Sequence, residues 1–116
     1  MGRFKEVKPF EERRKMFLTI MNKCENKIPI IIETDKRASL NFFSLAISIK
    51  PTRSVYKIIQ TTRKKIAIPE NEALYFYCNK KLLMGKRVIG EIYEQHKDED
   101  GFLYITVTSL ESMGCY

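Results

Sequence analysis

Histidine and cysteine are scarce in this chain, and their scarcity excludes several kinds of site. The sequence holds one histidine, His96, and three cysteines, Cys24, Cys78 and Cys115. The cysteine count is odd, no two cysteines have CxxC spacing and no pair of histidines lies nearby, so we expect neither a disulfide framework nor a zinc site. Cys24 and Cys78 lie in apolar periodic segments, which favours buried thiols and a reducing compartment.

Long apolar runs are also missing. No segment approaches the roughly 18 consecutive apolar residues that a membrane-spanning helix needs. Charged residues begin within the first three positions, so we expect no secretory signal peptide. Glu6 stands where a myristoylation signal requires serine or threonine, which disfavours lipid attachment at Gly2. We therefore expect a single cytoplasmic domain over residues 1–116, unless a lipid is attached to it later.

Groups suited to catalysis are few. His96 lies among polar residues at what reads as the exposed end of a helix, which favours a solvated or locally bonded histidine over a general base. The acidic pairs at 11–12 and 98–100 are near neighbours along the chain, so they do not face each other across a cleft as an acid and a base must. The segment 85–90 lacks the spacing of a phosphate-binding loop. The sequence therefore predicts a protein that is not an enzyme.

Positive charge is abundant but unevenly spread. The formal net charge is +7. Residues 1–66 hold 16 Lys or Arg and 6 Asp or Glu, whereas residues 67–116 hold 5 and 8. A basic front half of this kind raises encounter rates with acidic partners and orients them, although many charged surfaces serve only solubility.

A nucleic-acid-binding domain is an alternative from another class. A pI near 9.4 and the aromatic run Tyr75, Phe76 and Tyr77 would suit bases stacked on a sheet. However, strand alternation places Phe76 on the side opposite to its two neighbours, and no RNA-binding motif surrounds the run. The acidic second half interrupts a phosphate track. We expect core aromatics here and no nucleic-acid partner.

The periodicity of apolar residues predicts an N-terminal helical extension over about residues 1–25 and a flexible C-terminal tail over about 109–116. A short basic helix or turn is expected at 3–7, followed by a longer helix from Pro9 to Asn26. One face of that helix is formed by apolar residues at helical spacing: Phe10, Phe17, Ile20, Met21 and Cys24. The expected strands are 28–32, 45–49, 73–78 and 102–108, and the further helices are 54–66 and 88–96.

Without the N-terminal extension, the predicted order is β-β-α-β-α-β. Two strands, a crossover helix and two more strands are typical of the ubiquitin-type β-grasp. The sequence therefore predicts an α+β fold with a four-stranded mixed sheet, a central crossover helix and additional N-terminal helices.

Several stretches resemble the GABARAP and light-chain-3 family of autophagy modifiers. They are FKE at 4–6, PFEERR at 9–14, KIPIIIE at 27–33, RKKI at 63–66, GEIYE at 90–94 and KDEDGFLY at 97–104. The resemblance covers essentially the whole chain and is weakest over 34–62. It implies the β-grasp fold and a role as a ubiquitin-like modifier of autophagy.

The resemblance also implies a lipid-conjugation site at Gly114. A cysteine protease would remove Cys115 and Tyr116, and activating and conjugating enzymes would then join Gly114 to phosphatidylethanolamine, with no other cofactor. A terminus without a Cβ atom fits a narrow enzyme tunnel. The expected locations are the cytoplasm and, after conjugation, the autophagosomal membrane. Met113 departs from the aromatic residue that the family usually has before its glycine.

On the membrane, such a modifier recruits cargo receptors and adaptors that carry a short motif with an aromatic and an aliphatic anchor. The motif adds a strand to an open sheet edge, here about 46–50. Residue by residue, the resemblance gives a first pocket of Met16, Ile20, Pro29, Ile31 and Phe102. It gives a second pocket of Ile47, Ile49, Val55, Ile58, Thr62 and Lys65. The basic contacts to acidic flanking residues are Lys27, Lys50 and Lys65.

Some of these pocket residues, such as Ile31, Ile49 and Val55, also fit a plain core role. The chain departs from the family pattern at Met16 and Ala46, and polar side chains stand at three positions that are usually apolar: Arg53, Thr61 and Thr62. These departures predict a more polar second pocket and a shifted motif preference. An unconjugated adaptor of the same fold, which uses its basic helices on tubulin or another acidic surface, is the alternative function.

Overall fold

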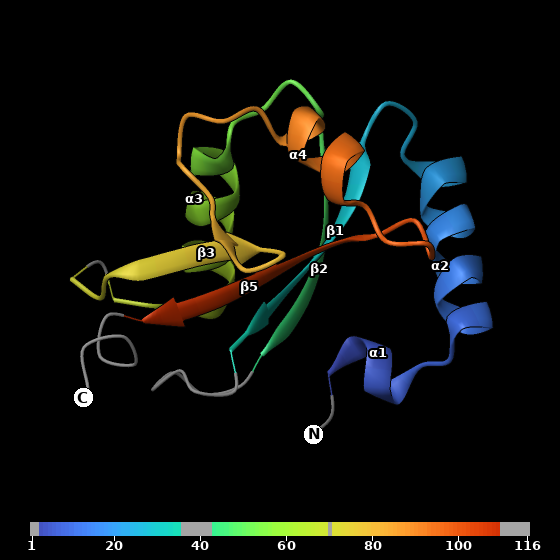
Figure 1. Cartoon of the computed structure of the whole chain (residues 1–116), viewed down its shortest axis with the longest axis horizontal. Coiled ribbons are helices and arrows are strands. Elements are labelled where there is room, and N and C mark those ends of the chain that lie inside the picture. The colour runs from blue at the N-terminus through green and yellow to red at the C-terminus, as the bar shows by residue number, and fades with distance from the viewer. Residues whose placement is uncertain (1–2, 36–42, 70, 110–116) are drawn as a thin grey trace.

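The computed structural model describes residues 3–35, 43–69 and 71–109 of the chain. Two helices come first, and five strands and two more helices follow (Figure 1). The helices are α1 (Phe4–Val7), α2 (Phe10–Lys23), α3 (Val55–Ile66) and α4 (Ile89–His96). The strands are β1 (Ile28–Thr34), β2 (Ser44–Ile49), β3 (Leu74–Cys78), β4 (Lys81–Leu82) and β5 (Leu103–Ser109).

The strands form one mixed sheet in the order β2-β1-β5-β3-β4. β1 and β2 are antiparallel neighbours, with Ile30 opposite Ile47. β1 and β5 are parallel, with Ile32 opposite Ile105. This parallel central pair, formed by the first and last long strands, is the β-grasp topology, and it confirms the predicted fold class. It also leaves β2 at one edge of the sheet.

The main core lies between the sheet and α3 and α4. In β1, Ile30 and Ile32 have no exposed surface, and strand alternation points both toward the helices on this side. α3 supplies Val55 and Ile58 to the same cluster, and both are fully buried. Other members of the cluster come from the remaining elements: Phe76, Cys78, Ile89, Ile92, Leu103, Ile105 and Val107.

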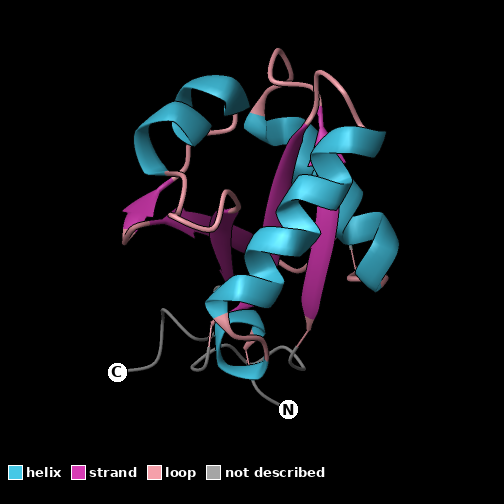
Figure 2. Ribbon diagram, turned by 90° about the vertical axis from the view of Figure 1, so that its right-hand side faces the viewer, coloured by secondary structure: helices cyan, strands magenta, loops and turns pink. Residues whose placement is uncertain are grey.

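The opposite face of the sheet carries α1 and α2. Figure 2, viewed from the side of α2, shows this helix lying across the strands. Ile31 alternates with the core isoleucines of β1, so it points toward this second layer, and it is 1% exposed. Phe102 is fully buried, and its ring packs edge-on against Phe4 and Phe17 at centroid distances of 5.5 and 6.1 Å. The molecule therefore has three layers, with the sheet in the middle.

The structure corrects several details of the sequence prediction. The sheet has a fifth strand, β4, where a polar connection was expected, because an Asn79–Lys80 turn with positive φ at both residues folds the chain back on β3. Ser109, assigned to the tail, is the fully buried last residue of β5. Phe10 is 44% exposed rather than on the inner face, and Cys24 is half-buried. The remaining tail, 110–116, lies outside the described residues.

Candidate functional site

A shallow groove runs along the open edge of the sheet, between β2 and α3. Its volume is about 260 Å³. Four consecutive residues of β2 line it, so the groove includes the backbone of the edge strand. In the described part of the chain, β2 pairs only with β1, which leaves the other side of its backbone unpaired. The lining residues are Ala46, Ile47, Ser48, Ile49, Lys57, Thr61 and Lys65.

The α3 wall of the groove is a single stripe of the helix. Lys57, Thr61 and Lys65 follow one another at intervals of four residues, so they lie above one another on one face. The Thr61 hydroxyl donates a hydrogen bond to the Lys57 carbonyl at 2.8 Å. Both lysines are exposed and Thr61 is half-buried. Opposite this polar stripe stand the apolar side chains of Ile47 and Ile49, so the groove has one apolar and one basic wall.

The groove contains three of the six residues predicted for the second pocket: Ile47, Ile49 and Lys65. The other three, Val55, Ile58 and Thr62, have no exposed surface and belong to the core. Thr62 adds no polarity to the groove, since its hydroxyl donates to the Ile58 carbonyl at 2.8 Å inside the helix.

Lys57 was absent from the predicted site. Lys57 could have been found from its spacing to the predicted residue Lys65, because the two lysines are two helical turns apart on the same face of α3. Arg53, the third position expected to make the pocket more polar, is exposed and does not line the groove.

The residues of the predicted first pocket lie at the junction of α2, β1 and the start of β5. Met16 and Ile20 on α2 are half-buried, and Pro29 is buried at the start of β1. Ile31 and Phe102 lie beneath the N-terminal helices, where Phe17 covers Phe102. A peptide side chain reaches these last two residues only when the helices shift.

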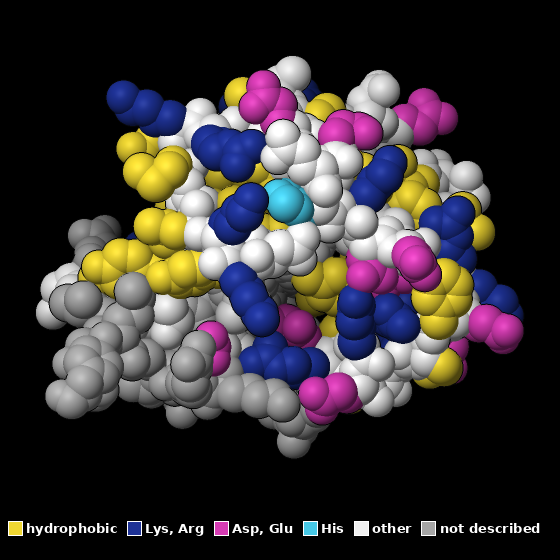
Figure 3. All heavy atoms as spheres, in the orientation of Figure 1, with side chains coloured by type: hydrophobic (Ala, Val, Ile, Leu, Met, Phe, Trp, Pro, Cys, Tyr) yellow, Lys and Arg dark blue, Asp and Glu magenta, His cyan; other side chains and the backbone are white. Residues whose placement is uncertain are grey.

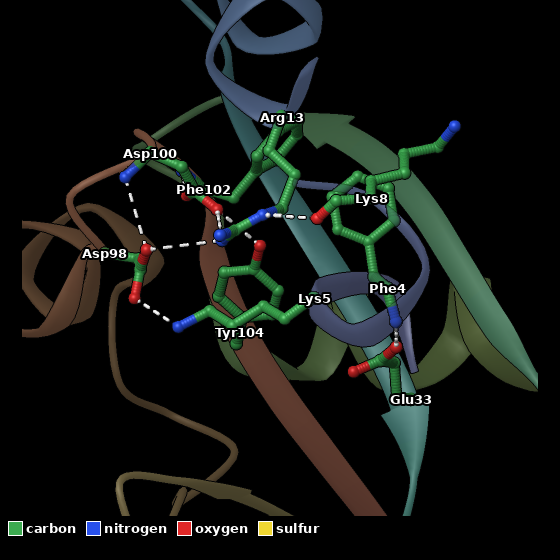
Figure 4. A network of polar contacts seen from close by, with 9 residues as sticks. All are labelled: Phe4, Lys5, Lys8, Arg13, Glu33, Asp98, Asp100, Phe102 and Tyr104. Atoms are coloured by element: carbon green, nitrogen blue, oxygen red, sulfur yellow. Dashed lines mark hydrogen bonds and ion pairs between the residues drawn. The ribbon is translucent and has the colours of Figure 1, made fainter. Parts of the chain in front are cut away.

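The N-terminal helices are held to the sheet by a polar network around the turn before β5 (Figure 4). The Arg13 guanidinium forms an ion pair with the fully buried Asp100 carboxylate at 2.6 Å. The second carboxylate of the turn, Asp98, accepts a hydrogen bond from Lys5 at 2.5 Å. Asp100 also accepts from the Tyr104 hydroxyl at 2.5 Å and from the Phe102 backbone N–H at 2.9 Å. One turn therefore anchors both α1 and α2.

A second anchor joins α1 to the end of β1. The backbone N–H of Phe4 donates to the Glu33 carboxylate at 2.6 Å, and the Ser44 hydroxyl donates to the same oxygen at 3.1 Å. Arg3 donates to the Thr34 carbonyl at 2.9 Å. Because Ser44 begins β2, this contact ties the start of the edge strand to the N-terminal helices.

The titratable groups of the network have pKa values set by their neighbours. Burial alone would raise the pKa of Asp98, but the hydrogen bonds from Lys5 and the Asp100 backbone, together with the charges of Lys5 and Arg13, outweigh it and hold this pKa below its usual range. Burial, followed by the hydrogen bond to Asp100, raises the pKa of Tyr104. At neutral pH, Asp98 is therefore charged and Tyr104 is a hydrogen-bond donor.

The described residues contain no arrangement suited to catalysis. His96 Nδ1 lies 2.8 Å from the Asn79 side-chain nitrogen, which confirms the expectation of a locally bonded histidine. Burial raises the pKa of the Cys78 thiol to about 11, so this thiol is protonated and unreactive at neutral pH. No group of three metal-ligating side chains occurs within 3–35, 43–69 and 71–109. In the same ranges, no helix is long and apolar enough to cross a membrane.

The basic side chains do not form a track for nucleic acid on the face seen in Figure 3. There, Lys and Arg side chains are separated by acidic and uncharged surface. The predicted basic contacts Lys27, Lys50 and Lys65 are all exposed. Gly114, Cys115 and Tyr116, on which the predicted processing depends, lie outside the described residues.

Known proteins share both the sequence pattern and the fold. The family model described as "Autophagy protein Atg8 ubiquitin like" matches residues 12–114. Autophagy-related protein 8 of Kluyveromyces lactis is 31% identical over 96% of this chain and 90% of its own length. Its counterpart in Candida glabrata is 30% identical over 96% of this chain and 95% of its own length.

A solved structure, that of ATG8 from Trypanosoma brucei, superposes with a TM-score of 0.88 at 23% identity. The superposition covers 95% of this chain and 96% of that one, and it supports the fold independently of the sequence comparisons. The family model spans nearly the whole sequence and the fungal relatives match over almost their full lengths, so this chain belongs to the Atg8 family and is a ubiquitin-like modifier of autophagy rather than an enzyme.

Proposed function

We propose that the chain is processed after Gly114 and conjugated through that glycine to phosphatidylethanolamine. The observation that carries this proposal is the family match, which begins at residue 12 and ends at Gly114. The residues beyond the match, Cys115 and Tyr116, are the piece that a cysteine protease would remove. The chemistry requires a free glycine carboxylate. An activating enzyme would convert it with ATP to an adenylate, releasing pyrophosphate, and an enzyme cysteine would displace AMP to form a thioester. The lipid amine would then displace the thiolate and form the amide.

The partners of the Atg8 family include enzymes of the lipid-conjugation pathway and adaptor proteins, and family membership supports both classes here. It likewise supports residence in the cytoplasm and on autophagosomal membranes. We assign the adaptor-binding role of this chain to the free edge of β2 and its groove. The unpaired backbone of β2 offers hydrogen bonds to an added strand, and the Ile47 and Ile49 side chains offer an apolar contact for its anchors.

The intact mass of the protein, expressed in cells with active autophagy, tests the conjugation. We expect loss of Cys115 and Tyr116 and then a gain in mass that matches one phosphatidylethanolamine. Gly114→Ala should abolish the lipid gain. A full-length, unmodified mass under starvation would contradict the proposal and leave an unconjugated adaptor, for which binding to tubulin would be the next measurement.

Residue-resolved NMR titration with a short peptide that carries an aromatic and an aliphatic anchor tests the docking edge. The expected result is that the backbone amides of 44–49 shift more than those of β4, at the opposite edge of the sheet. Equal shifts at both edges, or shifts confined to β4, would contradict the assignment to β2.

A further inference from the structure

The groove lies in a part of the chain that has no negative charge of its own. Residues 36–69 contain eight Lys or Arg and not one Asp or Glu. Both walls of the groove, β2 and α3, fall within this stretch. A carboxylate that enters the groove therefore meets cations and no acidic side chain from either wall.

Two of these cations are available at the groove itself. Lys57 and Lys65 line it, are exposed, and form no ion pair with any residue in the described ranges. Arg63, also on α3, does not face the groove as a free cation, because its guanidinium donates hydrogen bonds to the Pro69 and Glu72 carbonyls at 3.0 and 2.7 Å. On α3, Arg63 therefore holds the loop that follows the helix, whereas Lys57 and Lys65 face the groove.

The geometry places these two ammonium groups beside an added strand. Lys57 and Lys65 are two helical turns apart, about 12 Å along the axis of α3. Thr61 lies between them, and its hydroxyl proton is donated to the Lys57 carbonyl, so the two lysines supply the donors for a carboxylate. A strand paired with β2 would direct alternate side chains toward α3. A glutamate at such a position can reach a lysine head group, while its methylene groups contact Ile47 or Ile49.

We propose that this groove selects motifs with an acidic side chain at the position facing α3, in preference to the aliphatic anchor implied by the family resemblance. The inference rests on the proposed docking of a peptide strand at β2. Lys57 and Lys65 determine the specificity: each attracts the carboxylate, and neither wall offers an opposing negative charge. A leucine at the same position gains only the contact with the two isoleucines.

A peptide panel tests the preference. Each labelled peptide has one tryptophan and carries either glutamate or leucine two, three or four positions after it, in an otherwise identical serine–glycine sequence. Binding to the full-length protein is measured by fluorescence anisotropy. At one of the three spacings, we expect glutamate to bind about five-fold more tightly than leucine, which is at the upper end of what one exposed ion pair contributes. Raising the salt from 50 to 500 mM should remove most of this difference, because exposed charges are screened.

Matched variants identify the residues responsible. Lys57→Gln and Lys65→Gln should each reduce the glutamate preference to about two-fold or less. Lys64→Gln is the control: it removes the same charge from a neighbouring exposed lysine that does not line the groove, so the preference should remain. The double variant Lys57→Leu/Thr61→Leu makes two of the three side chains of the α3 wall apolar and should reverse the preference toward leucine. Circular dichroism of each variant confirms that it is folded.

Several results would overturn the proposal. Leucine peptides that bind as tightly as glutamate peptides, or a preference that Lys64→Gln removes as fully as Lys57→Gln does, would each reject a selective role for the groove. Absence of binding by every peptide would reject it too. None of these outcomes affects the mass measurement on Gly114, so failure of the groove proposal is distinguishable from failure of lipid conjugation.

Discussion

The two faces of the sheet are covered in physically different ways. On one face, α3 and α4 contribute fully buried apolar side chains such as Val55, Ile58 and Ile92. On the other face, α1 and α2, both described in full, contribute no buried residue. The N-terminal helices are instead held by ion pairs, hydrogen bonds and edge-on aromatic contacts around Phe102 and Asp100.

Because of this difference, the stability of the whole domain and the attachment of the N-terminal helices to the sheet should depend on different contacts. Apolar burial on the α3 side does not depend on the ionisation of a side chain, and it accounts for most of the fully buried surface of the domain. The polar contacts of α1 and α2 depend on the charge states of a few side chains, so we expect these helices to detach under conditions in which the sheet and α3 stay intact. The following predictions test this separation, in order of decreasing effect.

Ile58→Ala should damage the whole domain. The side chain is fully buried between α3 and the sheet, so its loss leaves a cavity and should lower the free energy of unfolding by about 3 kcal/mol. Urea denaturation followed by circular dichroism measures the change. Ile59→Ala, next to it but only partly buried, is the control and should cost clearly less. An equal loss at both positions would contradict the assignment of the core.

Asp100→Asn should act mainly on the N-terminal helices. It removes the nearer charge that pairs with Arg13 and should cost about 2 kcal/mol, because the largely buried guanidinium keeps only the more distant Asp98 carboxylate at 3.9 Å. Hydrogen exchange should show faster exchange in α1 and α2 than in the wild type, with α3 nearly unchanged. Glu99→Gln, an exposed neighbour in the same turn, should have no such effect. Uniform loss of protection across the chain would reject the separation of the two faces.

Low pH should weaken the attachment of α1 and α2 to the sheet, because it protonates Asp98. Its pKa is lowered in the folded protein, so the charged form stabilises docking above its ordinary pKa of 3.8, and this stabilisation is lost as the pH falls through the lowered value. An NMR titration should therefore find the Asp98 carboxylate titrating below 3.8. In Lys5→Gln, which removes the hydrogen bond and one nearby positive charge, the pKa should move upward. An unchanged value in that variant would show that Lys5 does not set it.

Lys80→Gly should give the smallest change, and it lies in the β3–β4 turn, outside the N-terminal helices. Lys80 has φ of +66° in the β3–β4 turn, a conformation that glycine adopts without steric cost. The substitution should raise the free energy of unfolding by about 0.5 kcal/mol, since relief of strain slightly exceeds the added entropy of the unfolded chain. Lys81→Gly, inside β4, should instead destabilise the protein. Exchange rates in α1 and α2 should be the same in both variants.

The order of the elements could be predicted from the sequence because apolar residues recur every second residue in the strands and at helical spacing in the helices. Leu45, Ile47 and Ile49 alternate as a half-buried strand must, and α3 shows a clear inner stripe at Val55 and Ile58. The family resemblance predicted a docking edge at about 46–50, and the structure has an open sheet edge and a groove there, at β2.

The sequence could not show which residues of α3 are buried beneath the groove and which residues line it. On α3, the buried stripe of 55, 58 and 62 and the exposed stripe of 57, 61 and 65 are neighbours, about 100° apart around the helix. Only the placement of β2 shows which stripe a ligand can touch. The clamp of Arg13 on Asp100 was likewise unpredictable, because it joins residues 87 positions apart in the chain.

The position of β5 in the sheet has a mechanical consequence. β5 is the strand that continues into the C-terminal tail, and it is hydrogen-bonded to β1 on one side and to β3 on the other. A pull along the strand from Ser109 loads both ladders in shear, so many hydrogen bonds share the force at once. An edge strand such as β2 would instead peel away one bond at a time. If the chain is tethered through its tail, as proposed, the force falls first on the ladders of β5 with β1 and β3, and the edge strand β2 lies outside them.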